Sequence, residues 1–133
     1  MKDLNVDIRL VNEKVLFTAV SGEHPGRPVP MDYVPPVGDG QGFAGLEMLL
    51  MSFCGCVSTA VVALLRRSGA VAGYEARATG IRREKPLSLE KIVFSVKVRS
   101  GDLKEADVEQ ALRTAAGISP VWLAIKGNVE VET

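Results

Sequence analysis

The sequence predicts an α+β protein, because the expected elements follow in the order of two strands, one long helix, two longer strands, two short helices and a last strand. Alternation of apolar residues with a period of two indicates the strands, and an apolar stretch of helical length fills the middle of the chain. With 133 residues the chain is long enough to bury a core, and we expect one domain over residues 1–133.

The first two strands are expected within residues 4–10 and 15–19, where apolar residues recur at every second position. This is the period of a strand with one buried face. Because Asn12-Glu13 can turn the chain between the two segments, the pattern predicts a hairpin.

The segment 21–42 differs in composition, since it holds five of the seven prolines and five glycines. This density disfavours both a helix and a central strand, although a short edge strand is expected around 29–33. Long irregular segments of compact domains are often functional. This stretch is therefore a candidate for the wall of a site, and it carries His24, Arg27, Asp32 and Asp39.

Residues 43–67 predict a central helix that is apolar almost all round, as expected for a helix enclosed by other elements. Ser68-Gly69 ends it, and Arg66-Arg67 suits the negative end of the helix dipole. The stretch also contains Glu47 and several glycine or serine interruptions, which favours a buried helix over a membrane span.

Two long strands are expected at residues 74–83 and 89–99, and the apolar alternation of the second predicts one buried face. Asp102 and Glu105 then match a variant of the capping box, which predicts a helix ended by Gly117. Ser119-Pro120 has the N-cap and N1 residues of a second short helix, and a last strand is expected around 129–131.

The charge balance argues against a polyanionic partner. Sixteen basic and sixteen acidic residues give no net charge, so neither nucleic acid nor an anionic membrane surface is an expected partner. The first residues enter the strand pattern directly, without the apolar core of a signal peptide. We therefore expect a soluble, cytoplasmic protein, in which cysteines stay reduced.

The two cysteines, Cys54 and Cys56, lie two residues apart in the central helix. Residues at this spacing point about 200° apart around a helix, so the two sulfurs cannot form a disulfide without breaking it. The only histidine, His24, with two oppositely directed cysteines makes a poor zinc site, and no metal or other cofactor is expected.

The chain resembles the OsmC/Ohr family of thiol peroxidases, and within it the YhfA-like branch. The likeness covers nearly the whole chain, and its strongest segments are 46–51 running into Gly55-Cys56, 81–84 before Pro86, and 101–105. The resemblance implies two layers of antiparallel sheet around a long central helix, formed by an intertwined homodimer. It also implies reduction of organic hydroperoxides in oxidative stress, by a cysteine that a second cysteine later captures as a disulfide.

Family roles can be transferred to single positions of this chain. The reactive cysteine falls on Cys56, and Arg27 is the only candidate in the long loop for the arginine that polarises the thiol. The family glutamate lies ten residues before the reactive cysteine, whereas Glu47 lies nine before it, about 180° around the helix. Glu47 is therefore either a catalytic residue or a first-turn acid favoured by the helix dipole.

The resolving cysteine of the family falls on Ser119, which cannot form a disulfide. As an N-cap before Pro120, this serine has a structural explanation worth about 1 kcal/mol. If Cys56 is oxidised, its sulfenic acid must be resolved by an external thiol, or by Cys54 after local unwinding.

Three functions are compatible with these residues, and the third is less favoured than the other two. The first is a one-cysteine, thiol-dependent peroxidase that acts on organic hydroperoxides as a homodimer. The second is a catalytically silent dimer that binds a small hydrophobic ligand and uses its cysteines for packing. The third is a thiol-based redox sensor. In the first two, the side chains expected to line the pocket are Met48, Met51, Phe53, Ser119 and Trp122.

Overall fold

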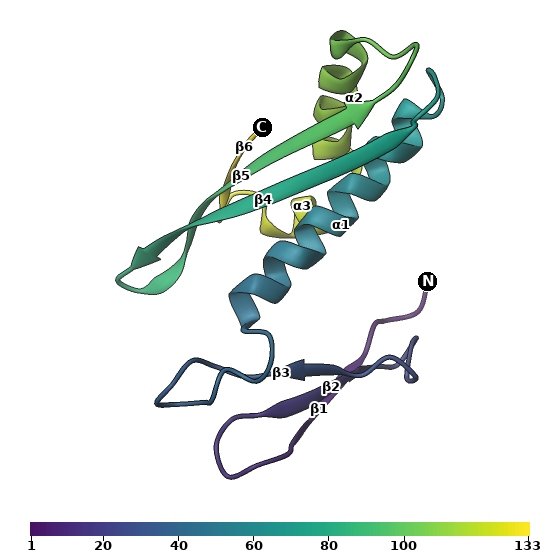
Figure 1. Ribbon diagram of the computed structural model, residues 1–133. Coiled ribbons are helices and arrows are strands. Elements are labelled where there is room, and N and C mark those ends of the chain that lie inside the picture. Colours follow the sequence, from purple (N-terminus) through teal and green to yellow (C-terminus); the bar gives the residue numbers. More distant parts are fainter. The chain divides into compact units, whose positions relative to one another are not determined.

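A computed structural model describes residues 1–133, and the α+β class is confirmed. The chain forms two compact units, Met1–Met48 and Leu49–Thr133, and that they belong to one domain stays a prediction. Figure 1 shows the order of elements, which is β1 (Val6–Leu10), β2 (Phe17–Ser21), β3 (Val29–Met31), α1 (Gly45–Leu65), β4 (Gly73–Glu84), β5 (Leu87–Arg99), α2 (Glu105–Ile118), α3 (Pro120–Ile125) and β6 (Glu130–Glu132).

The first unit contains a small antiparallel sheet in the order β1-β2-β3. The predicted hairpin is confirmed, and Ile8 pairs with Ala19 in its register. The side chains of β1 are exposed in the single chain, to 66% for Val6, 59% for Ile8 and 53% for Leu10. The alternation correctly predicts a strand with an apolar face, but the single chain does not bury that face.

A buried carboxylate, that of Asp32, organises the irregular segment after β3. It accepts hydrogen bonds from the backbone N–H groups of Tyr33 at 2.7 Å, Gln41 at 3.0 Å and Asp39 at 3.3 Å. A Cβ at Gly38 would overlap both this carboxylate and the Tyr33 carbonyl, so glycine is required there. The Gln41 N–H contributes most to the lowering of the Asp32 pKa, against an opposing effect of burial.

Acidification is expected to loosen residues 38–41. Because the folded-state pKa of Asp32 lies below 3.8, its ionised form stabilises the segment fully above pH 3.8. That contribution is lost as the pH falls through the lower, folded-state pKa. Hydrogen-exchange protection factors of these amides should fall over this range in the wild type. In Asp32→Asn they should be low at every pH, and equal protection of both proteins at neutral pH would contradict the argument.

The central helix α1 begins at Gly45, two residues later than predicted. Phe43 is still held in an extended bridge with Met31, and its N–H donates to the Pro30 carbonyl at 3.0 Å. The Glu47 carboxylate accepts the Ala44 N–H at 2.7 Å, so it satisfies one of the backbone donors exposed at the helix start.

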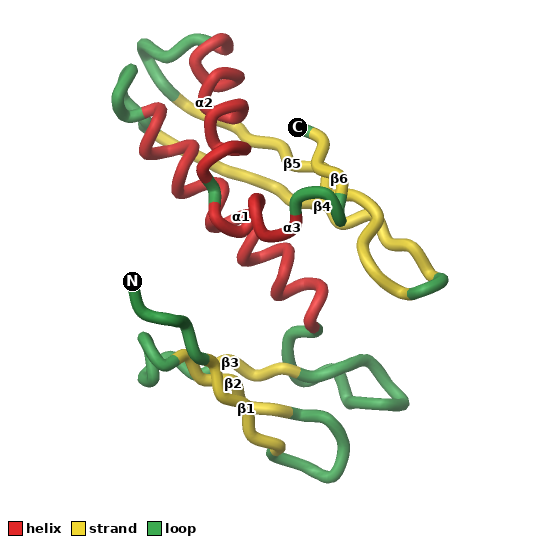
Figure 2. The backbone as a smooth tube through the Cα atoms, turned by 180° about the vertical axis from the view of Figure 1, so that it is seen from behind, coloured by secondary structure: helices red, strands yellow, loops and turns green.

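The second unit is a sheet in the order β4-β5-β6 with three helices on one of its faces, as Figures 1 and 2 agree. β4 and β5 form the predicted long hairpin, which has an irregular register between Ile81 and Arg82. β6 pairs with β5 in parallel, with Lys91 opposite Glu130. The ends of β4, β5 and β6 were predicted to within about two residues of their observed positions.

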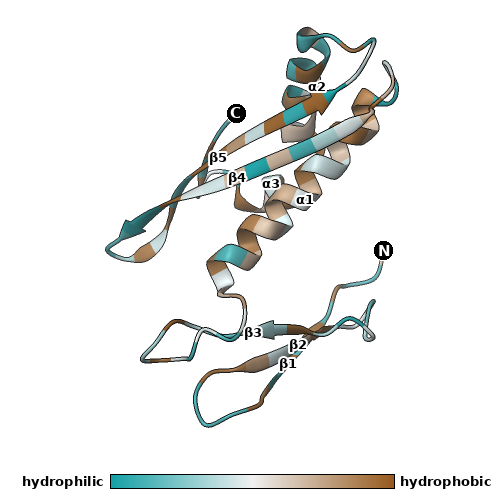
Figure 3. Cartoon of the chain, in the orientation of Figure 1, coloured by the Kyte–Doolittle hydropathy of each residue, from teal (hydrophilic) through white to brown (hydrophobic).

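The helix α1 packs on this sheet through one stripe of residues. Phe53, Val57, Val61 and Leu65 recur at every fourth position and are fully buried, together with Ile92 and Phe94 of β5. By length and composition alone α1 could cross a membrane, a test that core helices of soluble proteins also pass. Figure 3 shows mostly apolar and neutral residues along the visible side of α1, with a hydrophilic turn near its start. The buried stripe identifies α1 as a core helix, although the single chain covers only part of its apolar surface.

The predicted capping box of α2 is wrong. The helix begins at Glu105, and the N–H of its N-cap residue, Lys104, donates to the Asp107 carboxylate at 2.8 Å. Asp102 instead accepts the Ala70 N–H at 3.0 Å and so links two loops. The Asp102 carboxylate, which the local pattern assigned to the start of α2, is therefore bonded to a residue distant in sequence.

Candidate functional site

The candidate site is built on Cys56, which lies on α1 within the second unit and is partly exposed. The hydroxyl of Ser119 donates a hydrogen bond to its sulfur, with an Oγ to Sγ distance of 3.3 Å. Ser119 is fully buried, at 0% exposure, and stands between α2 and α3. The structure thus joins the two positions that the family pattern assigns to the reactive and the resolving cysteine.

The predicted side-chain cap of α3 is wrong. Ser119 is the N-cap residue, but its hydroxyl makes no capping hydrogen bond. Only its backbone takes part in the helices, since its N–H donates to the Ala115 carbonyl at 2.9 Å and its carbonyl accepts the Leu123 N–H at 2.9 Å. α2 also continues through Gly117, which was expected to end it, and stops at Ile118. The helix junction fixes the backbone of Ser119 and directs its hydroxyl to Cys56.

Two predicted pocket residues, Phe53 and Trp122, lie on α1 and α3 and contact each other. Phe53 precedes Cys56 by three residues on α1, and Trp122 follows Ser119 by three residues. Their rings lie 5.5 Å apart, and Phe53 also contacts Phe94 edge to face at 5.7 Å. Phe53 is fully buried, so it belongs to an aromatic cluster of the core.

Cys54 lies in a different environment from Cys56, as expected from their spacing, and both cysteines are free. Tyr74 of β4 donates a hydrogen bond to Ser58 at 2.9 Å, one helical turn after Cys54. Burial raises the pKa of the Tyr74 phenol, and the nearby Cys54 adds to this effect. Cys54 therefore faces the β4 side of α1, whereas Cys56 faces the junction of α2 and α3.

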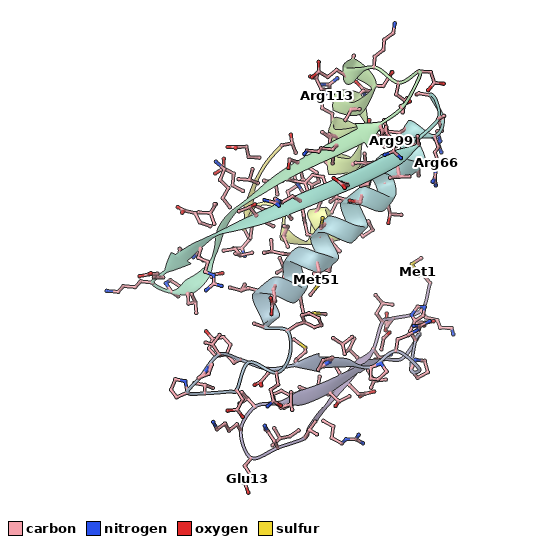
Figure 4. All side chains as sticks on the ribbon, viewed as in Figure 1. Met1, Glu13, Met51, Arg66, Arg99 and Arg113 are labelled. Atoms are coloured by element: carbon pink, nitrogen blue, oxygen red, sulfur yellow. The ribbon has the colours of Figure 1, made fainter.

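The other predicted site residues are Arg27, Glu47, Met48 and Met51. Arg27 is exposed in the proline-rich loop of the first unit, and Glu47 uses its carboxylate at the start of α1. Met48 is half-buried at the end of that unit, and Met51, labelled in Figure 4, is 45% exposed in the second unit. The roles expected for these residues around the thiol stay predictions.

Sequence reasoning missed a cavity of about 460 Å³ between β5 and α2. Its apolar lining comprises Phe94, Val96, Val98, Leu103, Val108 and Leu112. A second cavity, of about 520 Å³, includes Trp122 in its lining and shares Glu109, Leu112 and Thr133 with the first. Neither cavity is lined by Cys56. No group of three or more histidine, cysteine, aspartate or glutamate side chains is arranged to hold a metal ion.

The order and type of its elements define the class of this protein, an α+β protein with one long central helix. Residues 38–133 match the family model described as OsmC-like protein, and the chain therefore belongs to the OsmC-like family. The resemblance to the OsmC/Ohr family is confirmed, and placement in the YhfA-like branch stays a prediction. No curated protein matches the chain with significant similarity.

Solved structures share this fold over the whole chain. A hypothetical protein from Aquifex aeolicus is 22% identical, with a TM-score of 0.82 over 99% of this chain and 93% of its own. An OsmC-like protein of unknown function from Vibrio cholerae is 14% identical, with a TM-score of 0.83 over 100% and 98%. An organic hydroperoxide resistance protein from Legionella pneumophila is 14% identical, with a TM-score of 0.73 over 99% and 95%. At these identities the likeness shows the fold.

Proposed function

We propose that the protein is a cytoplasmic, thiol-dependent peroxidase that reduces organic hydroperoxides with Cys56. The observation that carries this proposal is the hydrogen bond from the buried Ser119 hydroxyl to the Cys56 sulfur. The partly exposed Cys56 thiol thereby has a hydrogen-bond donor beside its sulfur, an arrangement that suits a nucleophilic cysteine. Membership of a fold that includes an organic hydroperoxide resistance protein agrees with it.

In the proposed reaction, the Cys56 thiolate attacks the terminal oxygen of the hydroperoxide. A sulfur–oxygen bond forms, the oxygen–oxygen bond breaks, and the leaving alkoxide takes a proton from solvent to become an alcohol. The sulfur supplies two electrons and becomes a sulfenic acid. Arg27 would hold the thiolate by charge, and Trp122 with Met48 and Met51 would contact the apolar part of the substrate.

The proposed cycle is completed by an external thiol. Ser119 offers no sulfur, and Cys54 faces the β4 side of α1, so the chain has no thiol beside oxidised Cys56. One molecule of a small thiol would displace water from the sulfenic acid and form a mixed disulfide. A second molecule would then release the external disulfide and restore the Cys56 thiol.

The proposed working unit is a homodimer. The exposed apolar face of β1, with Val6, Ile8 and Leu10, is the kind of surface that a partner covers. α1 supports the same inference, because it is apolar almost all round while only one stripe of it is fully buried. A second copy would supply the missing contacts.

Consumption of cumene hydroperoxide by the purified protein, with 2-mercaptoethanol as the reductant, tests this proposal. We expect catalytic consumption above the rate of the reductant alone. Mass spectrometry should find a dimedone adduct at Cys56 when the reductant is left out. If no consumption exceeds the background and Cys56 reacts only after denaturation, the protein is not a peroxidase.

The second candidate function is that of a catalytically silent dimer that binds a small hydrophobic ligand. The cavity of about 460 Å³ favours it, because apolar side chains make up half of its lining residues and the thiol is not among them. Binding of the apolar dye ANS that is lost in Leu112→Asp, in a protein inert to cumene hydroperoxide, would support this function. Peroxide turnover without dye binding would exclude it.

A further inference from the structure

Ser119 differs from the other buried polar side chain of the protein in its choice of partner. Buried Asp32 accepts three backbone N–H groups, whereas the Ser119 hydroxyl has one hydrogen-bond partner, the Cys56 sulfur. The same hydroxyl stands at a helix N-cap position but forms no capping bond. The buried Ser119 hydroxyl therefore donates to a sulfur, although it stands where a serine side chain commonly caps a helix.

The charge on the sulfur decides how favourable this hydrogen bond is. A neutral thiol is a weak acceptor, so a hydroxyl buried against it is poorly satisfied. A thiolate is an ionised acceptor, and hydrogen bonds to ionised groups are roughly twice as strong as neutral ones. Full burial of Ser119 strengthens the difference, because no water competes for its hydrogen. The site is therefore better matched to the ionised form of Cys56.

The opposite direction, with the thiol donating to the Ser119 oxygen, would fit the same distance of 3.3 Å. In that arrangement the Ser119 hydrogen needs another acceptor, and the structure shows no second partner for the hydroxyl. Donation to the sulfur gives this buried hydrogen an acceptor. The two directions also have different effects on Cys56, because only donation by Ser119 favours the thiolate. Donation by the thiol requires that the sulfur keep its proton.

We propose that Ser119 is a positioning residue for Cys56, whose hydroxyl stabilises the thiolate and fixes its orientation. This inference rests on the proposed function, in which Cys56 is the nucleophile. Ser119 stands where the family pattern has the second thiol, and its hydroxyl acts on Cys56 through a hydrogen bond. It promotes the first attack by the sulfur and takes no part in resolving the oxidised product.

Alkylation of Cys56 by iodoacetamide tests the inference without any peroxide. In reduced, full-length protein at neutral pH, we expect the Ser119→Ala variant to be alkylated at Cys56 about tenfold more slowly, the effect of about 1.4 kcal/mol on ionisation. The difference should vanish at high pH, where the sulfur is ionised in both proteins. A purely structural role for Ser119 would not produce this dependence on pH.

Matched variants separate this effect from a loss of packing. Ser58→Ala removes another hydroxyl of the second unit, the one bonded to Tyr74, and should leave the alkylation of Cys56 unchanged. If Ser119→Ala lowers the melting temperature strongly, the pair Ser119→Thr and Ser119→Val replaces it, because these side chains match in shape and differ in the hydroxyl. The threonine variant should then react faster than the valine variant.

Equal alkylation rates at neutral pH, for Ser119→Ala against the wild type or for the threonine against the valine variant, would overturn the inference. A faster rate in the variants that lack the hydroxyl would also overturn it. The proposed function fails by a different result, a wild-type protein that does not consume cumene hydroperoxide. Alkylation that depends on Ser119 in such an inert protein would overturn the peroxidase proposal alone.

Discussion

Replacement of Cys56 by serine is expected to abolish the consumption of cumene hydroperoxide. Replacement of Cys54 by serine should leave it within about twofold of the wild type. The two residues are two positions apart on α1, but only Cys56 accepts a hydrogen bond from the Ser119 hydroxyl. A serine hydroxyl is a far weaker nucleophile than a thiolate at neutral pH, so loss of the sulfur removes the chemical step itself.

The pair of variants is well matched, because both exchange one sulfur for oxygen within the same helix. Melting temperatures should show that each variant is folded, and dimedone should label Cys56 in Cys54→Ser only. Equal loss of activity in both variants would show that the reaction depends on both thiols. Full activity in Cys56→Ser would place the chemistry elsewhere in the chain.

If Cys56 reacts as proposed, replacement of Ser119 by cysteine is expected to give a variant that closes an internal disulfide with Cys56 after one reaction with a hydroperoxide. The Ser119 oxygen and the Cys56 sulfur lie 3.3 Å apart, and two bonded sulfurs need about 2.05 Å, so a small adjustment brings them into bonding distance. The new thiol attacks the sulfenic acid at Cys56, one molecule of water leaves, and the disulfide forms.

Mass spectrometry of the non-reduced, digested protein should find nearly all of Cys56 linked to the new cysteine after one equivalent of cumene hydroperoxide. The same change in a Cys54→Ser background should give the same linkage, and in a Cys56→Ser background it should give none. Persistent sulfenic acid at Cys56 without linkage would show that the two side chains do not meet in solution.

The sequence was sufficient for the order and type of the elements because each has a local cause. Alternation identified the strands, the apolar stretch identified α1, and the Ser119-Pro120 pair identified the start of α3. Local rules failed where a distant partner competed. Asp102 bonds Ala70 rather than capping α2, and the Ser119 hydroxyl bonds Cys56 rather than capping α3.

The candidate site could be predicted only in part from the sequence. The family pattern selected Cys56 and Ser119 as a pair, but no local signal shows that a serine hydroxyl would point at the sulfur. The apolar periodicity of β1 likewise shows that one face is apolar without showing what covers it. Both are properties of tertiary or quaternary contacts, which short patterns do not encode.

The contact between Phe53 and Trp122 has a practical consequence for solution work. Trp122 is the only tryptophan of the chain, and its ring lies 5.5 Å from that of Phe53, a residue about one helical turn before Cys56. Indole emission depends on neighbouring charge and polarity, both of which would change if the sulfur gained an oxygen. We therefore expect the emission of Trp122 to report the proposed oxidation and re-reduction of Cys56 in real time without a label.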